Sequence, residues 1–104
     1  MHRIARIREL NDAFRQTLTG GAVWLTETVA ALPEVERKEV LRKVQTCVQF
    51  DNGDSVGEHE LVTVEHLGQR YRAKISYYSP DLRRCSDDPA DPSRTVRVLT
   101  IMRV

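Results

Sequence analysis

The stretch Gln69–Tyr78, QRYRAKISYY, alternates apolar and polar side chains and is rich in residues that favour β-strands. The preceding Glu58–His66 alternates as well, and Leu67-Gly68 between them fits a two-residue turn. The two stretches therefore predict a hairpin with Val64 opposite Tyr71. One face would carry Val62, Val64, Tyr71, Ala73, Ile75 and Tyr77, and the other Thr63, Glu65, Arg70, Arg72 and Lys74. A slip of one residue would exchange these faces, so the pattern fixes the register.

Helical spacing marks two segments before the hairpin. In residues 3–18 the positions Ile4, Ile7, Asn11, Phe14 and Leu18 form one stripe, and Gly20-Gly21 follows as a stop signal. A second helix begins after Pro33 and ends between residues 47 and 49. Residues 22–28 predict a short strand, and residues 95–104 a terminal strand that is either central or an exposed edge. The expected fold is α+β, with two N-terminal helices packed on one face of a three- to four-stranded antiparallel sheet, in a single domain over residues 1–104.

Charge and length exclude several classes of protein. The chain has 104 residues, with 16 Lys and Arg against 15 Asp and Glu, so a net charge of +1 gives no overall attraction to nucleic acid or to a membrane surface. No apolar run is long enough to span a bilayer, and the basic N-terminus lacks the apolar core of a signal peptide. We therefore expect a cytoplasmic protein with reduced Cys47 and Cys85, which could form a disulfide only if the fold brings them together.

The polar residues before the hairpin do not have the spacing of a known metal site. Asp51, Glu58 and His59 lie close in sequence, but no second His follows His59-Glu60 at zincin spacing and the acidic run does not match a calcium loop. No glycine-rich phosphate loop is present. The sequence predicts no cofactor, no metal site and no catalytic residue. A small metal-dependent hydrolase around His59, Glu58 and Asp51 stays as the weakest alternative.

Acidic and basic side chains gather in different segments. Four aspartates lie in the loop over residues 81–93, which is longer than a connector needs. Each of them could simply cap a turn, or the loop as a whole could contact a basic partner. The candidate contact residues for a protein partner are Asp51, Asp54, Glu58, His59, Asp81, Asp87, Asp88, Asp91 and Tyr78, with Trp24 as a further anchor if it is exposed. For a nucleic acid, the alternative set is Arg70, Arg72, Lys74 and Arg97.

Five stretches, in this order, carry a family resemblance: residues 10–15 (LNDAFR), Asp51-Asn52, residues 57–60 (GEHE), residues 74–78 (KISYY), and residues 88–92 (DPADP) leading into 97–102 (RVLTIM). They resemble a family of short bacterial proteins of unknown function that are often encoded on plasmids, prophages and other mobile elements. The chain departs from that pattern at Ser76 and Ser79, where the family has carboxylates. The resemblance implies a context and no reaction.

That context favours a small protein-interaction module that binds a host protein, such as an inhibitor of host defence, of which anti-CRISPR proteins are one class. The alternative is a nucleic-acid-binding accessory or regulatory protein that uses the basic sheet face. A homodimer paired through the terminal strand over residues 95–104 is a further open alternative.

Overall fold

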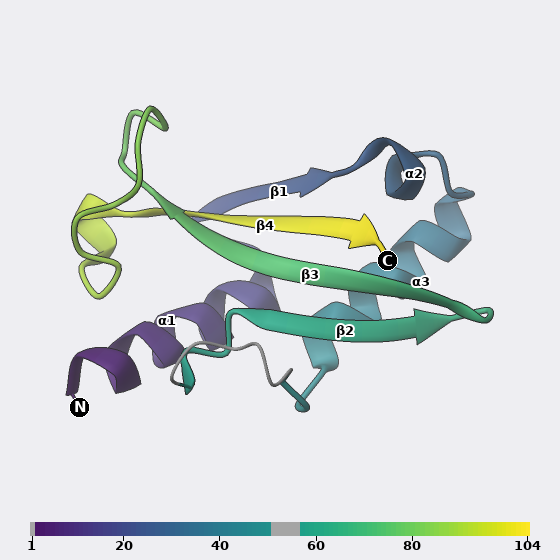
Figure 1. Ribbon diagram of the computed structural model, residues 1–104, viewed down its shortest axis with the longest axis horizontal. Coiled ribbons are helices and arrows are strands. Elements are labelled where there is room, and N and C mark those ends of the chain that lie inside the picture. Colours follow the sequence, from purple (N-terminus) through teal and green to yellow (C-terminus); the bar gives the residue numbers. More distant parts are fainter. Residues whose placement is uncertain (1, 51–56) are drawn as a thin grey trace.

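The computed structural model describes residues 2–50 and 57–104 (Figure 1). Its elements in chain order are α1 (His2–Thr17), β1 (Gly21–Leu25), α2 (Glu27–Ala30), α3 (Glu34–Thr46), β2 (Leu61–His66), β3 (Gln69–Tyr78), the 3₁₀ helix η2 (Pro92–Arg94) and β4 (Val96–Arg103). The predicted α+β class is confirmed: helices come first, and three of the four strands follow them.

The sheet has four strands in the order β1-β4-β3-β2. β2, β3 and β4 form the antiparallel meander that the sequence predicts, whereas β1 runs parallel to β4, so the sheet is mixed and mostly antiparallel. The terminal strand β4 lies between β1 and β3, which confirms the central alternative. Both edges of β4 are hydrogen bonded to other strands of the same sheet. Two copies therefore cannot pair through β4 in this fold.

The hairpin has the predicted register. Val64 lies opposite Tyr71, and Val62 lies opposite Ala73. The turn residues Leu67 and Gly68 have φ values of 50° and 78°, and positive φ at both central positions is the geometry of a type I′ turn. This turn type matches the twist of the flanking strands, so the local sequence was sufficient to specify the hairpin.

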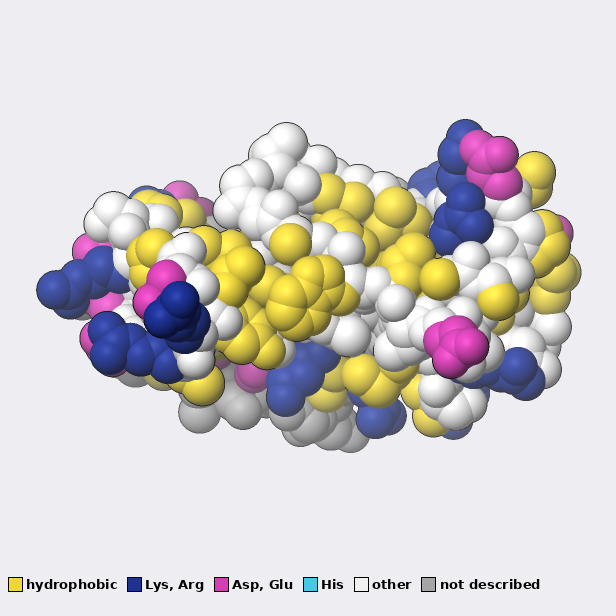
Figure 2. Space-filling view, turned by 90° about the horizontal axis from the view of Figure 1, so that it is seen from above, with side chains coloured by type: hydrophobic (Ala, Val, Ile, Leu, Met, Phe, Trp, Pro, Cys, Tyr) yellow, Lys and Arg dark blue, Asp and Glu magenta, His cyan; other side chains and the backbone are white. Residues whose placement is uncertain are grey.

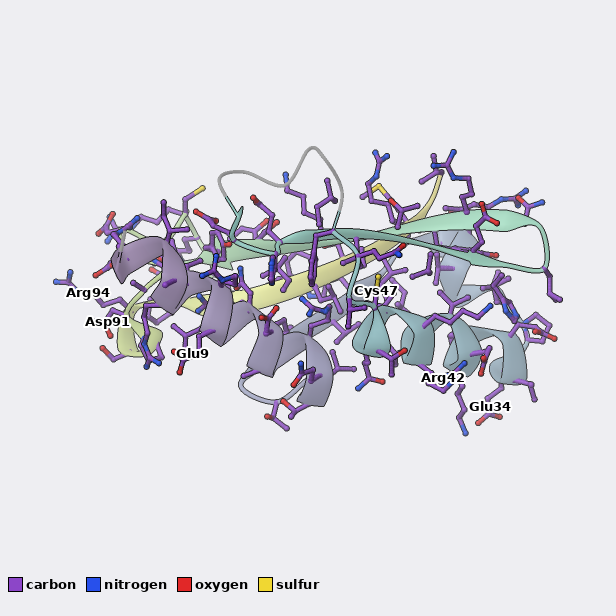
Figure 3. The ribbon with its side chains drawn as sticks, turned by 90° about the horizontal axis from the view of Figure 1, so that it is seen from below. Glu9, Glu34, Arg42, Cys47, Asp91 and Arg94 are labelled. Atoms are coloured by element: carbon purple, nitrogen blue, oxygen red, sulfur yellow. The ribbon has the colours of Figure 1, made fainter. Side chains whose placement is uncertain are left out.

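α1 and α3 pack on one face of the sheet, as Figure 3 shows from the side. The stripe of α1 buries Ile7 and Phe14, and α3 buries Val40 and Val44 against the inward side chains of the sheet. Each such side chain contributes roughly 1.5–3 kcal/mol when fully buried. The opposite face is not covered by any helix of the described residues, and the charged face of the hairpin lies there.

Two predicted strands are shorter than their sequence patterns. The first ends at Leu25 because residues 27–30 form the short helix α2, whose Val29 is buried in the core. β2 begins at Leu61 because residues 57–60 contact α1, as described below. The predicted turn at residues 51–53 lies outside the described residues. Cys47 and Cys85 are both free thiols. No helix of the described residues combines the length and hydrophobicity needed to cross a membrane.

Candidate functional site

A buried polar cluster joins α1 to the segments that carry the family resemblance. Asn11 is fully buried in the middle of the apolar stripe of α1. Its Nδ2 donates to the backbone oxygen of Glu58 at 3.0 Å and to Oη of Tyr77 at 2.8 Å. The Tyr77 hydroxyl in turn donates to the Glu58 carboxylate at 2.8 Å. One amide side chain thus fixes the position of residues 57–60 and of the end of β3.

Arg97 completes this cluster from β4. Arg97 is buried, with 5% of the residue exposed; its Nε donates to Oδ1 of Asn11 at 2.7 Å and its Nη2 donates to the backbone oxygen of Pro89 at 2.6 Å. The guanidinium also lies over the ring of Tyr77, 5.3 Å from its centroid. A buried cation is costly unless its N–H groups have acceptors. Here two neutral oxygens are the acceptors. The bond to the backbone oxygen of Pro89 attaches the loop after β3 to strand β4.

Burial shifts the titration of two members of the cluster. Burial raises the pKa of Tyr77 far above its ordinary value of 10, and the hydrogen bond to the Glu58 carboxylate acts in the same direction, because both disfavour a phenolate. Burial lowers the pKa of Arg97 from its ordinary value, and the neighbouring Tyr77 and Glu58 oppose that shift. The phenol therefore stays protonated and acts as a hydrogen-bond donor.

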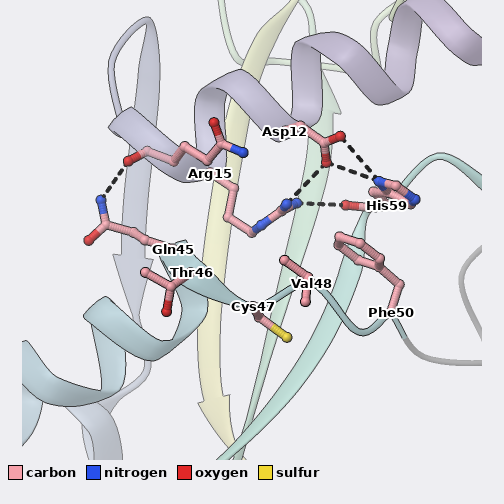
Figure 4. A pocket seen from close by; sticks show the side chains of 9 residues that line it. Asp12, Arg15, Gln45, Thr46, Cys47, Val48, Phe50 and His59 are labelled. Atoms are coloured by element: carbon pink, nitrogen blue, oxygen red, sulfur yellow. Dashed lines mark hydrogen bonds and ion pairs between the residues drawn. The ribbon is translucent and has the colours of Figure 1, made fainter.

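A second group of polar contacts lies one helical turn further along α1. Nη2 of Arg15 donates to Asp12 at 3.0 Å and Nη1 donates to the backbone oxygen of His59 at 3.3 Å. Nδ1 of His59 lies 3.0 Å from the same Asp12 carboxylate, and its ring stacks on Phe50 with centroids 3.7 Å apart. Figure 4 shows these side chains together with the end of α3 around a hollow of about 590 Å³.

His59 is held in an uncommon backbone conformation, with a φ of 59°. The contacts with Asp12, Arg15 and Phe50 hold both its backbone and its ring, so this strain is sustained by the surrounding packing. His59 thus lies beside the Asp12 carboxylate in this hollow, whereas Asp51, the carboxylate named in the hydrolase alternative, lies outside the described residues. However, no group of three or more His, Cys, Asp or Glu side chains with the arrangement of a metal site occurs in the described part of the chain.

The loop after β3 uses its acidic side chains mainly for its own turns. Asp81 accepts hydrogen bonds from the Ser79 hydroxyl and the Arg83 N–H, and Asp91 accepts from both groups of Ser93. These bonds lower the pKa of both aspartates.

The other acidic candidates differ in their surroundings. Asp88 accepts from Ala90 N–H and lies 3.4 Å from Arg3. Asp87 is exposed. Asp51 and Asp54 lie outside the described residues. Glu58 and His59 belong to the internal contacts above, so the acidic candidates do not form one continuous contact surface among the residues described.

The basic candidates divide between the two faces of the sheet. Arg70, Arg72 and Lys74 lie on the face without helices, as predicted. Arg97 lies opposite Tyr77 on the helix-covered face and is buried in the polar cluster. Our assignment of Arg97 to the basic sheet face is therefore corrected. The prediction failed because the register of β4 could not be read from its own sequence.

An aromatic pair lies on the face without helices. The rings of Trp24 in β1 and Tyr78 in β3 are 5.9 Å apart at 45°, although β4 runs between their strands. Pairing places Val98 between Ala22 and Ser76, at the level between the two rings, and Val98 is fully buried. Trp24 is nevertheless 47% exposed, as is Leu82 in the following loop. We call Trp24, Tyr78 and Leu82 the aromatic surface; Figure 2 shows hydrophobic side chains gathered along this β1 side of the molecule.

Sequence reasoning missed Asp12, Arg15 and Asn11 as site residues. Asn11 alone carried a signal, because an amide within an apolar helical stripe needs a buried partner. In the sequence, Asp12 and Arg15 have the pattern of solvent-exposed helix residues. The neighbouring residues do not indicate which distant segment contacts them.

The family model of a protein of unknown function, DUF3768, matches residues 25–104, and the chain belongs to this family. The match begins at the last residue of β1, so α1 with Asn11, Asp12 and Arg15 lies before it. No curated protein and no solved structure matches the chain.

Proposed function

We propose that this DUF3768 protein is a protein-interaction module that binds a host protein through the aromatic surface formed by Trp24, Tyr78 and Leu82. The observation that carries the proposal is the exposure of Trp24, which is 47% although the side chain is large and apolar. Trp and Tyr dominate the energetics of protein interfaces because they bury a large area with few rotatable bonds. Leu82, equally exposed, lies in the loop after β3, four residues beyond Tyr78.

The internal hydrogen bonds of the acidic residues support placing the partner-binding site on the aromatic surface rather than on the acidic loop. Asp81 and Asp91 are engaged in turns of the loop, and Glu58 is bonded to Tyr77. A partner would have to break these internal hydrogen bonds to use the carboxylates fully. The aromatic surface needs no such rearrangement, because Trp24 and Leu82 already expose apolar atoms. The loop after β3 contributes Leu82 to this surface.

The identity of the partner as a host protein rests on the resemblance to a family often encoded on mobile elements. Small proteins without a cofactor in that setting commonly act by binding a component of the host, including its cytoplasmic defence complexes. An inhibitor of host defence, such as an anti-CRISPR protein, is the member of this class that we propose first.

Affinity capture from a host extract with matched variants tests the proposal. We expect the wild-type chain to retain a stoichiometric protein and Tyr78→Ala or Leu82→Lys to weaken that complex at least about tenfold, the effect of losing a central contact. The control is Leu67→Lys, at the exposed hairpin tip, which should bind like wild type. Equal retention by all four proteins, each checked for folding by circular dichroism, would overturn the proposed surface.

A second candidate function is binding of single-stranded nucleic acid. The specific observation in its favour is that Trp24 and Tyr78 share the face without helices with Arg72 and Lys74. Aromatic rings can stack on bases while basic side chains contact phosphates.

Fluorescence anisotropy with labelled single-stranded DNA and RNA at low salt tests this alternative. Binding that falls steeply with added salt and is lost in Arg72→Ala/Lys74→Ala would support it. Binding of a protein partner that survives this double substitution and depends on Tyr78 would favour the first function.

A further inference from the structure

We propose that β1 pairs with β1 of a second copy of this chain, antiparallel and about a two-fold axis at Val23. The pairing would join the two four-stranded sheets into one continuous sheet. The argument rests on the edges of the sheet and stands independently of the proposed function.

The backbone of β1 exposes hydrogen-bonding groups at its outer edge. The N–H of Thr26, directly after β1, donates to the backbone oxygen of Ile101 in β4 at 3.1 Å. Successive residues of a strand direct their N–H and C=O groups to alternate sides. The groups of Trp24 therefore point toward β4, and those of Val23 and Leu25 point away from it. No strand of the described residues pairs with that side of β1.

The two edges of the sheet are protected differently. At the β2 edge, Nζ of Lys43 donates to the backbone oxygen of Glu65 at 2.8 Å and lies 3.1 Å from the ring of His66. A lysine at an edge is a common device against pairing with another chain. β1 has the sequence GAVWL and carries no charge. The unprotected edge is thus the apolar one, which is the arrangement expected if that edge has a partner strand.

The sequence of β1 is complementary to itself in the antiparallel direction. With Val23 opposite its own copy, Ala22 of each strand lies opposite Trp24 of the other, and Gly21 lies opposite Leu25. Each large side chain thus meets a small one. Val23, whose N–H and C=O point outward, forms the hydrogen-bonded pair at the axis, and the Ala22–Trp24 pairs fall at the closer, non-hydrogen-bonded positions.

Segments at the two ends of β1 flank this edge. Figure 1 shows the loop after β3 rising beyond one end of β1 and α2 rising beyond the other end. A two-fold rotation brings the loop of each copy toward α2 of the other. The loop carries exposed Arg83 and Arg84 together with exposed Asp81 and Asp87, and α2 begins with exposed Glu27. Both segments would therefore lie next to the paired strands in the proposed dimer.

The axis stands perpendicular to the sheet, so both copies keep their helices on the same side. The two aromatic surfaces then lie on one common face, with both Trp24 side chains near the axis. Such a dimer presents two equivalent contact surfaces, which raises the avidity for a partner with repeated sites.

Sedimentation equilibrium of the purified chain tests the inference. We expect wild type to have twice the chain mass of 11.9 kDa. Val23→Pro removes an outward N–H and should reduce the mass to that of one chain, because proline at an open edge does not affect the pairing with β4. If Val23→Pro fails to fold, Trp24→Lys serves instead, since it places like charges near the axis.

Two controls separate this result from failure of the proposed function. Leu67→Lys adds the same charge at the hairpin tip, and Tyr78→Ala alters the aromatic surface away from the β1 edge; both should stay dimeric. A single-chain mass for wild type at several hundred micromolar, or a dimer that persists in both Val23→Pro and Trp24→Lys, would overturn the inference. A dimer that binds no host protein would leave the inference intact and contradict only the proposed function.

Discussion

The side-chain oxygen of Asn11 accepts a hydrogen bond of 2.7 Å from Nε of Arg97, a residue 86 positions later in the chain. This bond connects the first helix with the last strand inside the protein. It also places the Arg97 guanidinium where the backbone oxygen of Pro89 can accept a second bond. The stretches that carry the family resemblance, apart from Asp51-Asn52, which lies outside the described residues, therefore meet around these two side chains.

Replacing Asn11 should destabilise the fold strongly. Asn11→Ala removes the acceptor of Arg97 Nε and the donor to Tyr77 and Glu58. Because this leaves a buried cation without one of its partners, we expect a loss of about 3 kcal/mol in the free energy of unfolding. Urea denaturation measures the change. Gln16→Ala, at an exposed position of the same helix, should stay within about 0.5 kcal/mol of wild type. A similar small effect for Asn11→Ala would contradict the role of the cluster.

Stability should fall at alkaline pH in a way that depends on Tyr77. Its pKa is raised in the folded state, so the unfolded chain loses the phenolic proton first, at its ordinary pKa near 10. The contribution is fully present below pH 10 and decreases above it, by up to about 1.4 kcal/mol per pH unit. The measurement is the difference in urea midpoint between wild type and Tyr77→Phe from pH 8 to 11. A difference that does not change across this range would contradict a raised pKa of Tyr77 in the folded state.

The hairpin turn should be improvable by one substitution. Leu67 adopts a φ of 50° and is 77% exposed, so it bears backbone strain without a packing contribution to offset it. Asparagine tolerates this conformation better than leucine does. We expect Leu67→Asn to raise the free energy of unfolding by about 0.5–1 kcal/mol. Thermal denaturation measures it; a lower melting temperature would show that the turn adopts another geometry.

Gly21 should not accept a side chain. A Cβ atom at this position would lie 2.3 Å from the backbone oxygen of Arg97 and 2.7 Å from Cε1 of Phe14. The backbone of Arg97 and the packed ring of Phe14 cannot move aside unless β1 shifts away from β4. We therefore expect Gly21→Ala to lower the free energy of unfolding by about 1–3 kcal/mol. Chemical denaturation checks the value. A neutral substitution would argue against the parallel pairing of β1 with β4.

Local pattern was enough to predict α1, α3, the approximate positions of the strands and one strand pairing, but not the short helices α2 and η2. The hairpin register followed from alternation and a two-residue turn, and Leu67 and Gly68 confirm that turn. Local pattern was not enough for β1. Its partner β4 lies at the other end of the sequence. No short turn joins the two strands, so the local sequence sets neither the relative direction of β1 and β4 nor the register of their pairing. Arg97 was misplaced for the same reason: without the register of β4, its face of the sheet could not be assigned.

The amino-acid sequence by itself determined the approximate positions of α1, α3 and the four strands, which side chains of the hairpin face the core, and that an amide lies within the apolar stripe of α1. These features depend on periodicity and turn chemistry within a few residues. Only the tertiary structure decided that β1 is an open edge, that Trp24 and Tyr78 meet across β4, and that Asn11, Glu58 and Arg97 form one cluster. Those contacts depend on how distant segments pack, because a side chain's partner is set by the shared core and not by its own neighbours in the chain.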